Sequence, residues 1–242
     1  MLYAELDSFE PLAIQEHEAG DAWRVFFRTS SHRDAARRAL ASEFENALEL
    51  HAIDVDDEDW ARRSQSALKA VRAGKIVIAP PWDAPPSVIP DPDTIVIIID
   101  PSTGFGTGHH ATTRLCLELL QDIELRGTRV IDLGTGSGVL AIAAAKLGAR
   151  DVVAIDNDPD ALRNARDNVQ RNDAAVGVLE ADLSELSVEP ADVVVGNLTA
   201  AVLQRFGGRI RKLANDRGTF IVSGFSPDDI DDVSRSLRVA PV

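Results

Sequence analysis

The sequence predicts an α/β protein in which a doubly wound, mostly parallel sheet follows a small N-terminal α+β part. Three observations indicate this. Beyond residue 94, segments that are apolar throughout alternate with helix-like segments, which is typical of a parallel sheet covered by helices on both faces. A glycine-rich turn joins one apolar segment to the helix-like segment after it. Six of the twelve prolines fall between Pro80 and Pro92 and separate this region from the residues before it.

The N-terminal part carries mixed strand and helix signals. We expect strands at 23–27, 52–55 and 75–79 and helices at 32–48 and 60–72. In the first of these helices, Ala36 and Leu40 belong to an apolar face with helical spacing. The sequence therefore predicts a small α+β domain at residues 1–79, a stiff proline-rich linker at 80–93 and a larger domain at 94–242.

In the larger domain, strands and helices alternate in order. We expect strands at 95–100, 128–133, 151–156, 176–179, 191–196 and 219–223, and helices at 111–121, 139–147, 159–172 and 200–213. Two helix ends are marked by single residues. Gly148 suits the position just after a helix, and Asp158 suits an N-cap because Pro159 follows it at the first helical position.

The composition limits the classes of function. Asp and Glu outnumber Lys and Arg by 39 to 25, so the net charge is −14 and the pI about 4.7. This balance opposes direct, sequence-independent binding to nucleic acid, although it does not oppose a basic protein partner. The single cysteine, Cys116, excludes an internal disulfide and a cysteine-rich metal site, and we expect no metal.

Neither membrane insertion nor export is expected. The longest apolar run, Val139 to Ala145, is far too short to cross a bilayer. The first ten residues are acidic and have neither the basic nor the apolar region of a secretory signal. We therefore predict a cytoplasmic protein without membrane attachment. The sequence does not indicate an oligomeric state.

The first motif that points to chemistry is Asp132-Leu-Gly-Thr-Gly-Ser-Gly. It lies between an expected strand and an expected helix, where a doubly wound sheet binds ligands. Gly134 and Gly136 allow the backbone to turn sharply and let a ligand approach without meeting a Cβ atom. The spacing is G-x-G-x-G rather than the G-x-G-x-x-G typical of dinucleotide binding. Taken alone, the motif is equally consistent with a tight turn that binds nothing.

Acidic side chains near the ends of neighbouring strands favour a nucleoside ligand. Asp156 ends the next strand, 22 residues beyond Gly134, where a carboxylate accepts both ribose hydroxyls. Asp182 follows the strand after that and is placed to reach an adenine amino group, although a solvated surface acid explains it equally well. Asp132 is expected either to orient the turn or to contact a charged amino-acid part of the ligand. The order of strand, glycine turn, helix, strand and acid predicts a nucleoside site.

A second glycine-rich segment, residues 100–110, precedes the helix that begins near Ala111. Its apolar Phe105 suggests a lid over a bound ligand, and Thr113 in the following helix presents a hydroxyl and an amide there. A flexible connection before a capped helix is the alternative. His109 and His110 have no evident carboxylate partner, so we interpret them as structural or loop histidines.

Asn197 directly follows an apolar strand and is the candidate catalytic residue. At the carboxyl end of a central strand, its side-chain carbonyl can accept a hydrogen bond from an amine and aim the nitrogen lone pair. An asparagine that caps the next helix is the alternative. The segment lacks the Pro-Pro-aromatic sequence with which a base-modifying enzyme stacks a flipped base.

Together these segments resemble the ribosomal protein L11 methyltransferases. The resemblance rests on Gly-Phe-Gly-Thr-Gly-His-His-Ala-Thr-Thr, on Val-Ile-Asp-Leu-Gly-Thr-Gly-Ser-Gly-Val-Leu-Ala-Ile-Ala-Ala, on Ala-Ile-Asp-Asn-Asp-Pro and on Asp-Val-Val-Val-Gly-Asn-Leu-Thr-Ala. It covers about Asp59 to Leu237. The glycine turn and its acid alone would indicate only a class I, Rossmann-like methyltransferase, whereas the lid segment and Asn197-Leu-Thr-Ala are more specific.

The resemblance implies S-adenosylmethionine as the cofactor and places Thr113, Gly134, Asp156 and Asn197 at cofactor positions. It also implies that the N-terminal domain recognises a basic ribosomal protein, L11, whose lysine side chains and N-terminal amine are methylated. Fewer than 60 residues precede Asp59-Trp60, where family members usually have a longer domain.

Other functions fit parts of the same pattern. A class I methyltransferase that acts on another protein or on a small amine would keep every cofactor residue. An NAD-dependent oxidoreductase shares the strand, turn and acid but requires the glycine spacing that is absent here. A non-catalytic module would bind the cofactor and transfer nothing.

Overall fold

The computed structural model describes residues 13–16, 23–27, 29–44, 48–53, 68–85, 91–101 and 110–240. The chain divides into two compact units, Met1–Trp60 and Ala61–Val242. The first unit contains one hydrophobic cluster among its described residues, and the second unit contains two.

In its described residues, the first unit combines two short strands with one helix. Its elements are β1 (Ala13–Glu16), β2 (Trp23–Phe26) and α2 (Ser30–Glu43), and the two strands are antiparallel. The helix begins after Thr29, whose hydroxyl accepts a hydrogen bond from the backbone N–H of His32. Ala36 and Leu40 are buried, as their helical spacing predicts. The expected strand at 23–27 is confirmed as β2, and the expected helix at 32–48 is confirmed as far as residue 43. Residue 44 ends the helix, residues 45–47 are not described and residue 48 is not helical. Strand β1 was not expected.

The expected elements between these units fall largely outside the described residues. Of the expected strand 52–55, residues 52 and 53 are not in a strand and the rest is not described. Of the expected helix 60–72, residues 60–67 are not described and residues 68–70 are not helical. The prediction of helix at residues 71 and 72 is wrong, because Val71–Ala73 forms strand β3. This strand turns at Gly74 and pairs antiparallel with the next strand, which overrides the local helical signal.

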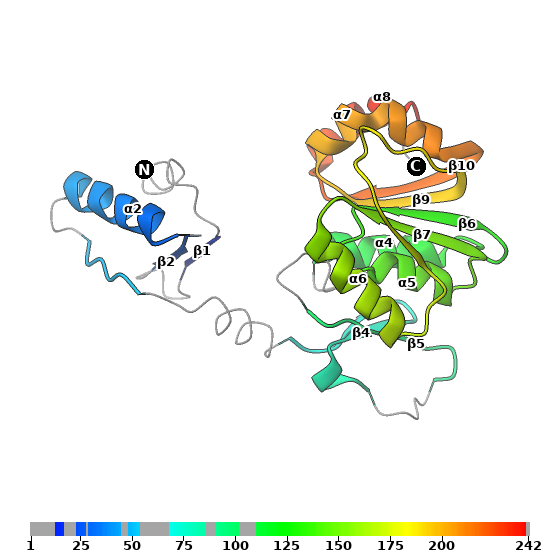
Figure 1. Ribbon diagram of the computed structural model, residues 1–242, viewed down its shortest axis with the longest axis horizontal. Coiled ribbons are helices and arrows are strands. Elements are labelled where there is room, and N and C mark those ends of the chain that lie inside the picture. The colour runs from blue at the N-terminus through cyan, green and yellow to red at the C-terminus, as the bar shows by residue number, and fades with distance from the viewer. Residues whose placement is uncertain are drawn as a thin grey trace. The chain divides into compact units, whose positions relative to one another are not determined.

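The second unit is built on a five-stranded parallel sheet (Figure 1). Its strands are β6 (Arg129–Leu133), β7 (Asp151–Asp156), β8 (Gly177–Glu180), β9 (Ala191–Asn197) and β10 (Ala214–Ser223). They lie in the order β10-β9-β6-β7-β8, and every pair is parallel. The order reverses between β6 and β9, so a ligand site is expected where these two strands end.

Helices cover both faces of this sheet, and the predicted doubly wound α/β fold is confirmed (Figure 1). One face carries α4 (Ala111–Gln121), α5 (Val139–Lys146) and α6 (Pro159–Arg171), and the other carries α7 (Ala200–Ile210) and α8 (Ile230–Leu237). Two hydrophobic clusters correspond to the two faces. Strand residues alternate between these clusters, as Val130 and Ile131 of β6 do.

A second sheet joins the residues on either side of the proline-rich segment. It consists of β3, β4 (Ile76–Ala79) and β5 (Ile95–Ile98), and β4 pairs parallel with β5. The sequence predicted a linker between domains at 80–93, whereas the compact units divide after Trp60. The physical reason is burial, because Ile76, Ile78 and Ile97 are fully buried in the cluster that contains α4 and α5.

Local capping signals are borne out in the larger unit. Gly148 follows α5 with φ +102°, and its N–H donates to the carbonyl of Ala145. Asp158 caps α6 by accepting the N–H of Asp160, and Pro159 is the first helical residue. Helix α8 was not expected from the sequence. Within the described ranges, none of the helices combines the length and the apolar character that a membrane span requires.

Candidate functional site

The glycine turn leads from the end of β6 into α5 and lies beside the point where the strand order reverses. Gly134, Gly136 and Gly138 have φ of +64°, +54° and +84°, a backbone region that residues with a Cβ rarely adopt. A Cβ at Gly134 would lie 2.5 Å from Cδ2 of Leu198, the residue after Asn197. The turn therefore requires glycine for its conformation and, at Gly134, for the close approach of the β9 loop.

Asp132 lies beneath this turn and is almost completely buried, with 1% of its surface exposed. Its Oδ2 accepts hydrogen bonds from the Thr135 hydroxyl at 2.6 Å and from the Ala141 N–H at 3.1 Å. Its Oδ1 is buried and has no hydrogen-bond partner among the described residues. The pKa of this carboxyl is raised to about 7, mainly by burial and to a smaller extent by the nearby charge of Asp156, against the lowering effect of the two hydrogen bonds.

This pKa predicts that Asp132 destabilises the ligand-free protein as pH rises. The folded-state pKa is raised from 3.8, so between about pH 4 and 7 the unfolded chain loses its proton first. The contribution of Asp132 to the free energy of unfolding therefore falls through this window, by about 4 kcal/mol in total, and levels off above pH 7. We expect Asp132→Asn to flatten this part of the pH dependence, as measured by urea unfolding at several pH values. Equal slopes for both proteins would contradict it.

Asp156 and Asp182 lie at the carboxyl ends of neighbouring strands. One carboxylate oxygen of Asp156 accepts the N–H of Gly136 at 2.9 Å, and the other accepts the N–H groups of Asn157 and Asp158. Asp182 is exposed, and hydrogen bonds from Ser184 hold its pKa below the ordinary value, with smaller effects from Asn157 and Arg205. The structure thus joins Asp156 to the glycine turn and leaves Asp182 at the solvent-facing rim.

Asn197 ends β9 and is held between two other elements. Its Nδ2 donates to the Thr113 hydroxyl of α4 at 3.2 Å, and its Oδ1 accepts from the Ser223 hydroxyl at the end of β10 at 3.1 Å. Next to Ser223, Gly224 has φ +97°, and a Cβ there would lie 2.8 Å from the Asn197 Oδ1. The structure brings Asn197 and Thr113 together, whereas Ser223 and Gly224 carried no motif in the sequence.

The expected lid is only partly within the described residues. Residues 102–109, which include Phe105 and His109, lie outside them. His110 precedes α4 and is exposed, and α4 begins at Ala111 as predicted. On the other side of the segment, Asp100 and Pro101 follow β5.

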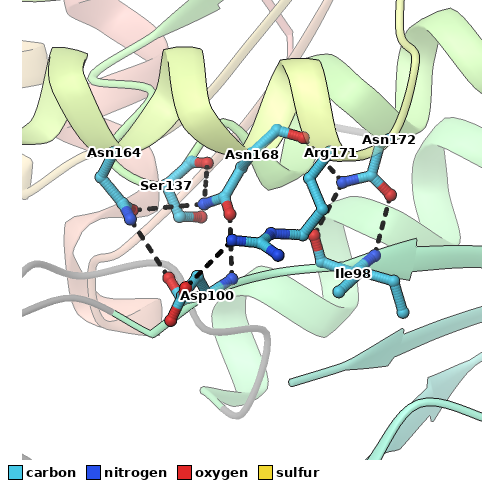
Figure 2. Close-up of polar contacts among 7 residues, drawn as sticks. All are labelled: Ile98, Asp100, Ser137, Asn164, Asn168, Arg171 and Asn172. Atoms are coloured by element: carbon cyan, nitrogen blue, oxygen red, sulfur yellow. Dashed lines mark hydrogen bonds and ion pairs between the residues drawn. The ribbon is translucent and has the colours of Figure 1, made fainter. Parts of the chain in front are cut away.

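Two turns of helix α6 satisfy the free edge of β5 with asparagine side chains (Figure 2). Asn172 accepts the N–H of Ile98 at 2.8 Å and donates to its carbonyl at 2.7 Å, as a neighbouring strand would. One turn earlier, Asn168 accepts the N–H of Asp100 at 2.9 Å. The spacing of four residues places both side chains on the same helix face.

Asn168 also connects this edge to the glycine turn (Figure 2). It is fully buried, and its Nδ2 donates to the carbonyl of Ser137 at 3.0 Å. Asn164 and Arg171 add contacts to Asp100 through a hydrogen bond to its carbonyl and an ion pair with its carboxylate. The Asn168 side chain therefore links the end of β5 to the last residues of the glycine turn by hydrogen bonds. No sequence motif had indicated this link.

The family model of ribosomal protein L11 methyltransferases matches residues 4–239. The chain belongs to this family. An L11 methyltransferase of Caldicellulosiruptor saccharolyticus is 39% identical over 200 residues, which are 82% of this chain and 65% of that protein. One from Vibrio campbellii is 40% identical over 206 residues, 84% of this chain and 67% of that protein.

A crystal structure of another L11 methylase agrees with the fold of this chain. The crystal structure of a ribosomal protein L11 methylase from Lactobacillus delbrueckii subsp. bulgaricus superposes with a TM-score of 0.63 at 28% identity, and covers 71% of this chain and 88% of that chain. The chain spans about two thirds of the length of the curated L11 methyltransferases that it matches. The family resemblance predicted from the motifs is confirmed.

Proposed function

We propose that the chain is an S-adenosylmethionine-dependent protein N-methyltransferase that acts on amines of ribosomal protein L11. The observation that carries the proposal is the buried, unpartnered Oδ1 of Asp132 beside three left-handed glycines. A buried carboxylate oxygen without a donor is costly, and an ammonium group of a ligand would supply one. Membership of the L11 methyltransferase family supports the reaction and the acceptor.

The residues at the carboxyl edge of the sheet suit the parts of this cofactor. Asp132 would face its ammonium group, Gly134 and Gly136 would allow its close approach, and Asp156 would accept its ribose hydroxyls. The two oxygens of Asp156 already accept backbone N–H groups but keep lone pairs for hydroxyl donors. Asp182 at the rim would accept from the adenine amino group. When bound, the cofactor supplies a methyl group activated by a sulfonium.

The acceptor amine must be neutral to attack. Neutralising a free lysine at pH 7 costs about 4.6 kcal/mol, whereas an α-amine costs about 1 kcal/mol. We assign Asn197 the role of holding the neutral amine through its side-chain carbonyl, with Thr113 and Ser223 fixing the orientation of the carboxamide. The proton leaves to solvent before attack, since no general base is evident in the described residues around Asn197.

The proposed acceptor, a basic ribosomal protein, also indicates what each unit of the chain does and where the protein acts. We assign recognition of L11 to the first unit, Met1–Trp60, and methyl transfer to the second unit, Ala61–Val242. A net charge of −14 favours encounter with a basic protein and disfavours direct binding to nucleic acid. A ribosomal protein acceptor implies a cytoplasmic location without membrane attachment.

The proposal is tested by two measurements on the full chain. Calorimetric titration with S-adenosylmethionine, with NADH as the comparison, asks whether the site takes the proposed cofactor. Incubation with isotopically labelled S-adenosylmethionine and purified L11, followed by mass spectrometry, asks whether L11 gains methyl groups on amines. Methylation of another protein or a small amine, but not of L11, would keep the reaction and reject the acceptor. Binding of cofactor without any transfer would reject the enzyme.

Gly134→Ala is expected to weaken cofactor binding by about tenfold or more, because the new Cβ displaces Leu198 beside Asn197. Gly127→Ala is the matched control. Gly127 has φ +78° and open space around it, so both variants carry the left-handed strain of about 1–2 kcal/mol but only one alters the turn. Calorimetry should separate them. Equal affinities for the two variants would argue against a cofactor role for Gly134.

A further inference from the structure

A cavity of about 840 Å³ lies apart from the glycine turn, at the opposite edge of the sheet. It is bounded by residues 186–188, which precede β9, by the second half of α7 and the residues before β10, and by Arg238 after α8. These segments lead into strands at their amino ends, whereas the glycine turn follows a carboxyl end. The cavity is therefore a second site and not an extension of the first.

The rim of this cavity is strongly positive. Five cations and no carboxylate line it among the described residues: Arg205, Arg209, Arg211, Lys212 and Arg238. Among the residues that the structure describes, none of the five forms an ion pair. In a chain of net charge −14, this is a local concentration of positive charge, within which Arg205 acts electrostatically on the carboxylate of Asp182. The rim suits an anionic partner and repels a basic acceptor such as the one proposed above.

The lining between these cations is apolar and distinguishes two anionic partners. Aliphatic side chains contribute Leu186, Val188 and Leu213. Phe206 also lines the cavity, but the Arg205 guanidinium covers its ring at 5.1 Å from the centroid. A single-stranded nucleic acid would need exposed aromatic faces on which to stack its bases. The combination of an aliphatic floor and a cationic rim instead matches a peptide that carries both aliphatic and acidic side chains.

Gly208 provides an independent indication of a close partner. It lies inside α7 and lines the cavity, and a Cβ there would meet no atom within 4 Å. Its neighbour Gly207 is different, because a Cβ there would lie 2.6 Å from the Ser236 carbonyl oxygen of α8. A glycine inside a helix destabilises it relative to alanine. Packing between helices accounts for Gly207, whereas nothing within the described residues accounts for Gly208.

We propose that this cavity binds an acidic, amphipathic segment of a partner protein. Aliphatic side chains of the segment contact Leu186, Val188 and Leu213, and its backbone passes close to Gly208. Its carboxylates pair with the arginines of the rim, whose forked guanidinium groups match carboxylates. The segment does not need the cofactor site, so the proposal stands whether or not the chain is a methyltransferase.

The test measures binding of a fluorescent twelve-residue peptide of alternating Leu-Val and Asp-Glu pairs to the full chain by anisotropy. We expect saturable binding that weakens with salt and falls about tenfold or more in the double variant Arg205→Glu/Arg209→Glu. Arg166→Glu, an exposed reversal on α6, is the control and should bind as the wild type does. Equal loss in the control, or equally tight binding of a peptide with Lys in place of Asp and Glu, would overturn the proposal.

Gly208→Ala separates binding from folding, because the two effects have opposite signs. We expect the melting temperature to rise by about 2 °C while the affinity for the acidic peptide falls. Unchanged peptide affinity in this variant would overturn the proposed close approach. Tighter binding of a single-stranded oligouridylate than of the peptide would show that the cavity serves nucleic acid and would reject the protein partner.

Discussion

Asn197→Ala is expected to lower the rate of methyl transfer by about 100-fold or more while the protein stays folded. The substitution removes the carbonyl that would hold the acceptor amine, and with it the hydrogen bonds to Thr113 and Ser223. Cofactor affinity should change less than the rate, because the glycine turn, Asp132 and Asp156 remain. The rate is measured with saturating L11 and labelled S-adenosylmethionine, and folding by circular dichroism.

Asn215→Ala serves as the matched control for this variant. Asn215 lies on β10 and donates to the Asp192 carboxylate at 2.9 Å, at the amino end of the sheet. The Asn215→Ala variant thus removes an asparagine hydrogen bond between β9 and β10 without altering the candidate site. Thr113→Val adds a positioning test, because it removes the hydroxyl that accepts from the Asn197 amide. We expect an intermediate loss of rate. Full activity of Asn197→Ala would reject its catalytic role.

Asn168→Leu is expected to cost about 2–6 kcal/mol of unfolding free energy and to weaken cofactor binding. Leucine has a similar volume but removes the acceptor of the half-buried Asp100 N–H and the donor to the carbonyl of buried Ser137. The loss of the Ser137 contact loosens the last residues of the glycine turn. Urea unfolding measures the first effect, and calorimetry at a temperature where the variant is folded measures the second.

Asn172→Leu is the control that keeps this prediction specific. Asn172 makes a pair of hydrogen bonds to Ile98 and, among the described residues, forms none with the glycine turn. Both variants should be destabilised, but only Asn168→Leu should lose affinity. Hydrogen exchange at the Asp100 amide gives a readout that does not depend on ligand, and it should become faster in Asn168→Leu. Equal affinities in the two variants would assign Asn168 a purely structural role.

The parts of the fold that local patterns describe were predicted well. The glycine turn, Asp156 at the end of its strand and the caps at Gly148 and Asp158 depend on neighbours within a few residues. The limits of α4 agreed with the apolar spacing of its residues. Helix α7 ended at Ile210 rather than at 213, because residues 211–213 tighten into a 3-10 turn before β10.

By itself, the sequence determined which residues face a core and where the strands of the parallel sheet run, and it predicted a nucleoside site at the glycine turn. Only the tertiary structure decided that β4 and β5 pair across the prolines, that Asn168 meets Ser137, and that Ser223 meets Asn197. It also brought the second half of α7 together with residue 238 around a positive cavity. The physical reason is that periodicity reports whether a side chain is buried, whereas a hydrogen bond between residues 31 positions apart depends on how whole elements pack.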